Sequence, residues 1–153
     1  MQNLIENDAY NLAIEKAEKI GERFTEPRKL VFQSLMNAKG PQKAYDIIDY
    51  VSRQSDKTTK PPTVYRALDF LCRIGVVHKI ESDSTYSICS HNDHCHKANH
   101  SPLFLICKEC GDVEEIHLSD IEDSIENAAH KKGFALSRIM IEAVGTCQNC
   151  AQK

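Results

Sequence analysis

Apolar residues recur at helical spacing four times in the first half of the chain. The four stretches cover residues 10–20, 27–39, 44–51 and 61–74, and each ends at a glycine or a polar segment. Apolar positions three or four residues apart form one face of a helix, so each stretch predicts an amphipathic helix. The fourth begins with two prolines, which the first turn of a helix tolerates because its N–H groups have no helical partners.

Two short β-rich segments follow, over residues 76–80 and 85–89, separated by Glu81-Ser82-Asp83-Ser84. They predict a β-hairpin. If Asp83 and Ser84 form its turn, His78 lies directly opposite Cys89, with Cβ atoms about 4.5–5.5 Å apart. Three helices, a fourth helix with a polar face and a terminal hairpin together predict a winged helix-turn-helix domain over residues 1–90.

The polar face of the fourth predicted helix is a candidate DNA-reading surface. Tyr65, Arg66 and Asp69 point away from its apolar stripe. Arginine can donate two hydrogen bonds to guanine in the major groove, and tyrosine can contact a phosphate or a thymine methyl. Lys60 and Arg28 are candidates for holding the DNA backbone. The alternative is an ordinary solvated helix face.

The second half of the chain predicts a smaller α+β unit. Residues 91–102 have almost no apolar content and predict a linker between domains. Strands are expected over 103–107 and 113–117, and then a helix over 118–130 whose Ser119 and Glu122 form a capping box. A long β-rich run covers 134–144. A unit of about 50 residues, 103–153, has a small core and needs support from a metal, from dimerisation or from both.

Composition excludes several classes of protein. The chain has 153 residues, of which 41% are hydrophobic and 27% charged, as in ordinary globular proteins. No apolar run approaches the roughly 20 residues that a membrane-spanning helix needs. Residues 1–20 are amphipathic and lack the apolar core of a secretory signal, so we expect a cytoplasmic protein without membrane partners.

The net charge of −3 is divided unevenly. Residues 1–90 hold 13 Lys and Arg against 12 Asp and Glu, whereas residues 91–153 hold 6 against 10. Contact with DNA is therefore expected in the first part, and no strongly basic tail is present for non-specific binding.

Seven cysteines and seven histidines indicate metal binding. Clustered cysteines in a reducing compartment more often bind metal than form disulfides. Cys107-x2-Cys110 and Cys147-x2-Cys150 flank the predicted strand-helix-strand unit, and two such pairs complete a tetrahedral zinc site. Redox pairs and buried free cysteines are the alternatives. Four thiolates leave no open position for catalysis, so the predicted role of this zinc is structural.

A second candidate metal site combines residues that are distant in sequence. His78 and Cys89 come from the hairpin, His100 from the linker and Glu115 from the second unit. Together they would supply a mixed nitrogen, sulfur and oxygen tetrahedron that bridges the two domains. The alternative is that these are ordinary surface or core residues. Five further linker residues, His91, Asp93, His94, Cys95 and His96, are candidates for an extra metal site, a scavenging loop or a solvated linker.

Several segments resemble the ferric uptake regulator (Fur) family. The stretch from Lys60 to Leu71, KPPTVYRALDFL, resembles that family's recognition helix, and the two CxxC pairs match its structural zinc site. Residues 23–28, RFTEPR, resemble its R-x-T-P-Q-R segment with the proline displaced by one position. The resemblance extends over roughly residues 10–150.

Within the family, the zinc uptake regulators are the most similar branch. Segments 44–46, 77–79, 133–136 and 141–143 resemble that branch. This resemblance implies that His78, Cys89, His100 and Glu115 are the ligands of a regulatory zinc. Iron sensors have a His-His-Asp-His run just before the first CxxC, where this chain has Ser101-Pro102-Leu103-Phe104. A thiolate ligand at Cys89 also favours zinc over iron or manganese.

The resemblance implies a zinc-responsive repressor that is not an enzyme. It would act as a homodimer with two Zn²⁺ per subunit, binding double-stranded operator DNA of zinc-uptake genes when zinc is abundant. An iron- or peroxide-responsive regulator of the same family is the nearest alternative. Two others belong to different classes: a passive zinc-binding protein that uses residues 91–100, and a zinc hydrolase with Glu115 as general base. Four candidate ligands and the lack of a recognisable nucleophile argue against the hydrolase.

Overall fold

The computed structural model describes residues 2–55, 59–90 and 102–152. The chain divides into two compact units, Met1–His96 and Lys97–Lys153. This division falls within the predicted linker over 91–102. All of that linker except Pro102, including the predicted ligand His100, lies outside the described residues.

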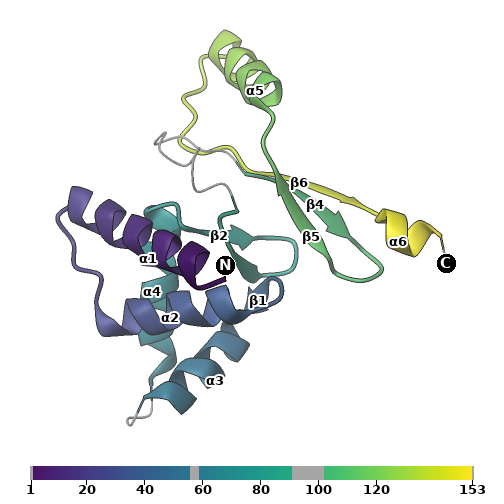
Figure 1. Cartoon of the computed structure of the whole chain (residues 1–153). Coiled ribbons are helices and arrows are strands. Elements are labelled where there is room, and N and C mark those ends of the chain that lie inside the picture. The colour runs from purple at the N-terminus through teal and green to yellow at the C-terminus, as the bar shows by residue number, and fades with distance from the viewer. Residues whose placement is uncertain (1, 56–58, 91–101, 153) are drawn as a thin grey trace. The chain divides into compact units, whose positions relative to one another are not determined.

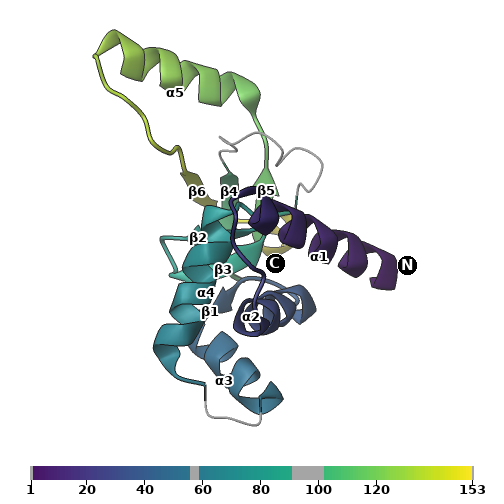
Figure 2. The same cartoon turned by 90° about the vertical axis from the view of Figure 1, so that its left-hand side faces the viewer.

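Four helices build most of the first unit: α1 (Gln2–Lys19), α2 (Glu26–Asn37), α3 (Ala44–Gln54) and α4 (Pro61–Arg73) (Figure 1, Figure 2). All four were predicted from apolar spacing. Pro61 and Pro62 occupy the first two positions of α4, where proline costs no helical hydrogen bond. Gly75 follows α4 with a positive φ of 71°, a conformation that glycine adopts without steric cost.

A single hydrophobic cluster holds these helices together. Both α2 and α3 contribute to it, and α4 contributes the largest share, with buried Val64, Ala67, Leu68, Phe70 and Leu71. Tyr10, Phe24 and Phe32 meet in edge-to-face contacts, with ring centroids 5.4–6.0 Å apart. Because α4 is buried along one side, its opposite side is held outward in a fixed orientation.

A three-stranded sheet closes the first unit in the order β1 (Gln42–Lys43), β3 (Thr85–Ile88), β2 (Val77–Ile80). β2 and β3 are the predicted hairpin. The two-residue β1 has no sequence pattern of its own and was not predicted. It pairs with Thr85 and Tyr86 of β3 and leads directly into α3. The hairpin is therefore linked through β1 to the first helix of the helix-turn-helix.

The predicted hairpin register is wrong by two residues, because the partner of His78 is Ser87 and not Cys89. Ile80 pairs with Thr85, so the turn contains four residues instead of two, and His78 lies opposite Ser87. Ser84 allows this turn by adopting a left-handed conformation with φ of +52°. Cys89 lies beyond the end of β3, where its N–H donates to the Val76 carbonyl at 3.0 Å.

The second unit contains a three-stranded sheet in the order β5 (Val113–Ile116), β4 (Leu103–Cys107), β6 (Ile141–Gly145). β4 is antiparallel to β5 and parallel to β6. Helix α5 (Ser119–Lys131) connects β5 to the segment that precedes β6, and both views show it standing off the end of the sheet (Figure 1, Figure 2). The short α6 (Gln148–Ala151) was not predicted.

Two predictions for this unit differ from the structure. The β-rich run over 134–144 is a strand only from Ile141, since the five residues of β4 are all paired with β6 and offer nothing further to pair with. The capping box is absent, because Ser119 is already helical and Leu118 is the N-cap. The Glu122 carboxylate instead lies 3.6 Å from Nδ1 of His117.

None of the helices in the described part of the chain is long and apolar enough to cross a membrane.

The left-handed turn at Ser84 generates a stability prediction. We expect Ser84→Gly to raise the free energy of unfolding by about 0.5–1 kcal/mol, because glycine adopts positive φ without the steric cost of Cβ. Ser84→Ala is the matched control and should stay within about 0.5 kcal/mol of the wild type. Urea unfolding followed by tyrosine fluorescence suits this test, because all five tyrosines lie between residues 10 and 86. Equal effects of the two substitutions would contradict it.

Candidate metal centres and nucleic-acid face

The four cysteines of the two CxxC pairs meet at one end of the second unit. Cys107 is the last residue of β4, Cys110 lies in the turn before β5, and Cys147 and Cys150 belong to the segment around α6. Their Sγ atoms all lie within 4.8 Å of one another. No pair among them forms a disulfide. The structure thus brings together all four ligands of the predicted structural site.

Backbone hydrogen bonds hold this sulfur cluster in shape. Cys147 N–H donates to Sγ of Cys107 at 3.3 Å, and Sγ of Cys110 lies 3.8 Å from Sγ of Cys147. The turn after Cys107 is closed by Gly111, whose N–H donates to the Cys107 carbonyl at 2.9 Å and whose φ is +74°. Lys108 N–H joins this turn to the Gly145 carbonyl of β6 at 2.9 Å.

The surroundings of the four cysteines favour the thiolate form of Cys107. Backbone N–H donors, with Cys147 first among them, lower the pKa of Cys107 to about 6. The neighbouring thiols of Cys147 and Cys110 raise the pKa of Cys150 to about 12. At neutral pH Cys107 is therefore a thiolate beside at least one protonated thiol. A zinc ion would displace the remaining protons, because thiolates are its ligands.

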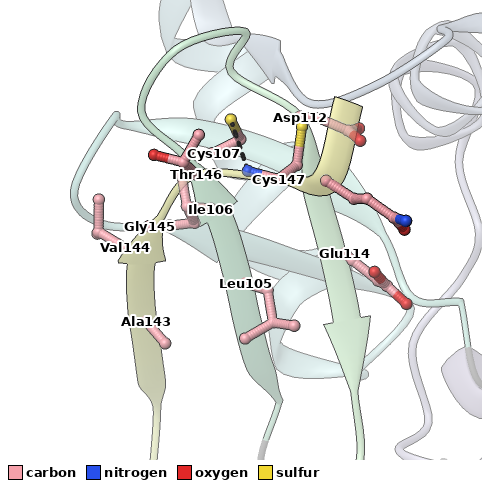
Figure 3. Close-up of a pocket in the computed structure, with 11 residues that line it drawn as sticks. Leu105, Ile106, Cys107, Asp112, Glu114, Ala143, Val144, Gly145, Thr146 and Cys147 are labelled. Atoms are coloured by element: carbon pink, nitrogen blue, oxygen red, sulfur yellow. Dashed lines mark hydrogen bonds between the residues drawn. The ribbon is translucent and has the colours of Figure 1, made fainter. Parts of the chain in front are cut away.

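A shallow pocket of about 380 Å³ adjoins the sulfur cluster on the sheet. Figure 3 shows Leu105 and Ala143 below Cys107 and Cys147, with Glu114 at the side and the Cys147 N–H bond to Cys107 dashed. The pocket combines exposed apolar side chains with carboxylates, and apart from the cysteines its lining offers the hydroxyl of Thr146. The arrangement suits a structural metal better than catalysis.

The second candidate metal centre begins with two residues of the hairpin. His78 and Cys89 are both buried, and their ligand atoms lie within 4.8 Å of one another. They are diagonal neighbours instead of the predicted opposite pair. They nevertheless share one face, because side chains two residues apart on a strand point the same way. An imidazole nitrogen beside a thiol sulfur is a donor pair that suits zinc.

The other two predicted ligands of this centre, His100 and Glu115, do not belong to the first unit. Glu115 lies on β5 of the second unit, where it pairs with Phe104 of β4 and is half-buried. His100 lies outside the described residues. Their part in a common site stays a prediction.

The polar face of α4 is presented to solvent as predicted. Tyr65 is 47% exposed although it follows the buried Val64, and Arg66 and Asp69 are also exposed. Lys60 is the exposed N-cap of the same helix. The helix therefore offers a tyrosine, an arginine and a lysine on the side opposite the core.

Arg28 has a different environment from the other predicted DNA contacts. It is half-buried, and its guanidinium lies 3.4 Å from the centroid of the Phe70 ring and 2.7 Å from the Glu22 carboxylate. Arg73 contacts the other oxygen of the same carboxylate. No sequence pattern predicts the pairing of Glu22 with Arg73, because they are 51 residues apart and belong to no shared motif.

Comparison with known proteins agrees with this geometry. The model of the ferric uptake regulator family matches residues 19–144. The chain belongs to this family. It is 40% identical to the zinc uptake regulation protein of Escherichia coli K12 over 141 residues, which cover 90% of this chain and 80% of that protein. It is 26% identical to the peroxide operon regulator of Bacillus subtilis over 144 residues, covering 92% of each chain.

Two solved structures resemble the fold closely. A zinc uptake regulator complexed with zinc and DNA has a TM-score of 0.80 and 38% identity, covering 94% of this chain and 95% of the other. Holo XcZur has a TM-score of 0.81 and 33% identity, covering both chains in full. The α+β fold of a winged helix-turn-helix domain and a small α/β domain is thereby confirmed.

The sulfur cluster generates a testable prediction. We expect Cys107→Ser to remove one zinc equivalent per chain and to unfold the second unit, because a metal clamp at the ends of β4 and α6 supports a small core. The tyrosine signal of the first unit should persist. Zinc content after gel filtration and limited proteolysis measure the two effects. Cys72→Ser, on α4, is the matched control. A Cys107→Ser protein with its full zinc content and a protease-resistant second unit would refute the clamp.

Proposed function

We propose that the protein is a zinc-responsive transcriptional repressor that binds the operator DNA of zinc-uptake genes. The observation that carries this proposal is the buried His78–Cys89 donor pair in the same domain as the exposed polar face of α4. The relatives named as zinc uptake regulators, one of them solved with zinc and DNA, support the same function. Its family is one of regulators, and we propose no catalytic activity.

Two zinc ions per subunit would serve different purposes. The tetrathiolate of Cys107, Cys110, Cys147 and Cys150 suits a structural zinc, because all four positions of a tetrahedron are filled by protein. His78, Cys89, His100 and Glu115 would form the regulatory site. A thiolate among these ligands favours zinc over Fe²⁺ or Mn²⁺, which prefer harder donors. This preference separates the proposal from an iron- or peroxide-responsive regulator.

The protein would act as a homodimer through its second unit. Helix α5 buries none of its residues although it is amphipathic. Phe134 is 66% exposed and Val144 on β6 is 62% exposed. Large apolar side chains this exposed on a small unit are typical of a surface that another chain covers. A second copy of the same unit is the simplest partner, because most oligomers are symmetric.

Zinc would control DNA binding through the angle between the two units. Ligands from the hairpin, the linker and β5 would tie the DNA-binding domain to the dimerisation domain. In a dimer this would set the two α4 helices about 34–36 Å apart, one turn of DNA. Without zinc many hinge angles would be sampled, and few would match both half-sites. Zinc and DNA would then strengthen each other's binding reciprocally.

Three residues of α4 and its N-cap would make the DNA contacts. Arg66 would donate to a guanine and Tyr65 would contact a thymine methyl or a phosphate, both in the major groove. Lys60 would bind a phosphate at the start of the helix, where the helix dipole also favours an anion. A repressor of this kind works where the chromosome lies, so we place the protein in the cytoplasm.

The regulatory site is tested by Cys89→Ser and His78→Ala. Both variants should lose at least about 100-fold of their operator affinity at a free zinc concentration that saturates the wild type, because each removes a zinc ligand. Fluorescence anisotropy of a labelled promoter fragment from a zinc-import gene, in buffered Zn²⁺, Fe²⁺ or Mn²⁺, measures this. The folded dimer should persist by gel filtration.

Cys72→Ser is the control for loss of a thiol outside the site, and it should respond to zinc as the wild type does. A Cys89→Ser protein with an unchanged zinc response would remove Cys89 from the regulatory site. Wild-type protein that binds DNA equally with and without zinc would instead indicate a passive zinc-binding protein. Activation by iron at lower concentration than zinc would assign the protein to the iron-responsive alternative.

The DNA contacts are separated by Arg66→Ala and Lys60→Ala. Arg66→Ala should cost about 1–3 kcal/mol of operator affinity and relax the preference at one base pair. Lys60→Ala should weaken all DNA sequences alike and reduce the salt slope of log K by about 0.9. Lys19→Ala, on α1 and paired with Glu15, is the control for loss of a positive charge. Equal discrimination between bases in Arg66→Ala and wild type would exclude Arg66 from base recognition.

A further inference from the structure

A single carboxylate joins two arginines at the C-terminal end of α4. The Glu22 carboxylate accepts from Arg28 at 2.7 Å through one oxygen and from Arg73 through the other. Arg28 also donates to the Arg23 carbonyl. Glu22 and Arg23 lie in the connection between α1 and α2, whereas Arg73 ends α4. We call Glu22, Arg28 and Arg73 the Glu22 bracket.

The bracket closes over an aromatic side chain of α4. The Cζ atom of Arg28 lies 3.4 Å from the centroid of the Phe70 ring, and Cζ of Arg73 lies 5.6 Å from it. Phe70 is buried and also contacts Phe24, with ring centroids 6.5 Å apart. A guanidinium over a ring face is attracted by the ring's quadrupole. Phe70 is therefore held by the two arginines as well as by Phe24.

This contact bears on the residues that would read DNA. Phe70 follows Arg66 by four residues, which is about one helical turn. The hydrophobic core holds α4 along its length through Val64 and Leu68, and the bracket adds charged contacts at its last turn. Residues four apart lie on the same side of a helix, so a change in the direction of that turn would also move Arg66.

We propose that Glu22 is a positioning residue for the DNA-reading helix, and that Arg28 acts through Phe70 instead of through a DNA phosphate. This inference rests on the proposed DNA-binding function of α4. It replaces the expectation that Arg28 holds the DNA backbone. To reach a phosphate, Arg28 would have to leave the Glu22 carboxylate, the Arg23 carbonyl and the Phe70 ring, and its side chain is only 21% exposed.

The two roles of Arg28 predict opposite effects of Glu22→Gln. If Glu22 competes with DNA for Arg28, removing its charge frees an arginine and tightens binding to every DNA sequence. If Glu22 positions α4, the same change loosens the bracket and lowers affinity for the operator alone. Glutamine has the same shape as glutamate, so the substitution changes charge with little change in packing.

The experiment compares the zinc-loaded full chain and its variants on two DNA fragments of equal length. One is a promoter fragment from a zinc-import gene and the other is its scrambled sequence, both followed by fluorescence anisotropy over a series of salt concentrations. Glu22→Gln should lose about tenfold of its preference for the promoter fragment. Its affinity for the scrambled fragment and its salt slope should match those of the wild type.

Arg28→Gln provides a second, independent readout. A positioning role predicts a loss of preference similar to that of Glu22→Gln and an unchanged salt slope, whereas a phosphate contact predicts a slope reduced by about 0.9. The double variant should be little worse than either single one, because residues that act as a unit have non-additive effects. Glu18→Gln, an exposed carboxylate of α1, controls for the change in net charge.

Tyrosine fluorescence in urea gives the folded fraction of each variant, which corrects the affinities. A bracket that serves stability alone would lower the unfolding midpoint and leave the corrected preference for the promoter unchanged, which would overturn the proposal. Tighter binding by Glu22→Gln to both fragments would also overturn it. Wild-type protein that does not bind the promoter fragment in zinc would refute the proposed function itself, and the inference with it.

Discussion

The register of the β2–β3 hairpin is the constraint on which the first unit depends most. Ile80 pairs with Thr85 across a four-residue turn, and this pairing sets every other neighbour along both strands. It puts His78 and Cys89 on one face as diagonal neighbours. It also presents Thr85 and Tyr86 to β1, which leads into α3. One turn conformation therefore connects the candidate zinc ligands to the helix-turn-helix.

Side-chain pattern predicts structure where the two are directly linked. Apolar spacing located four helices, and the CxxC pairs located the sulfur cluster. Pattern does not predict structure where backbone geometry or a pairing partner decides the outcome. The left-handed conformation of Ser84 has no signature in a serine, so the register was wrong. The strand before Gly145 is shorter than its β-rich run because β4 has only five residues to pair with it.

The candidate zinc ligands and the predicted capping box show where a sequence pattern predicts the structure and where it does not. His78 and Cys89 share a face despite the register error, because a shift of two residues preserves side-chain parity. The capping box failed for a different reason. Helix α5 already includes Ser119 and has Leu118 as its N-cap, so the serine is not at the position that a capping box requires. Residue types alone do not fix the first residue of a helix.

The second unit depends on contacts that its own side chains do not supply. Its buried apolar residues, among those described, lie mainly on β4 and beside it: Pro102, Leu103, Phe104, Cys107 and Ile139. The apolar side of α5 is left uncovered. Hydrophobic burial on this scale provides little stability for about 50 residues. A metal at the sulfur cluster and a partner on α5 would act at opposite ends of the sheet, so neither would make the other unnecessary.

Arg28 shows why residue type alone does not establish a DNA contact. Arginine is well suited to phosphate recognition, but its planar guanidinium also stacks on aromatic rings and pairs with carboxylates. Arg28 uses both of these alternatives at once, on Phe70 and Glu22. Lys60, by contrast, is exposed at the N-terminus of α4, where the helix dipole favours a phosphate. The positive charge of the first unit is thus divided between side chains that are available to DNA and side chains that orient the helix presenting them.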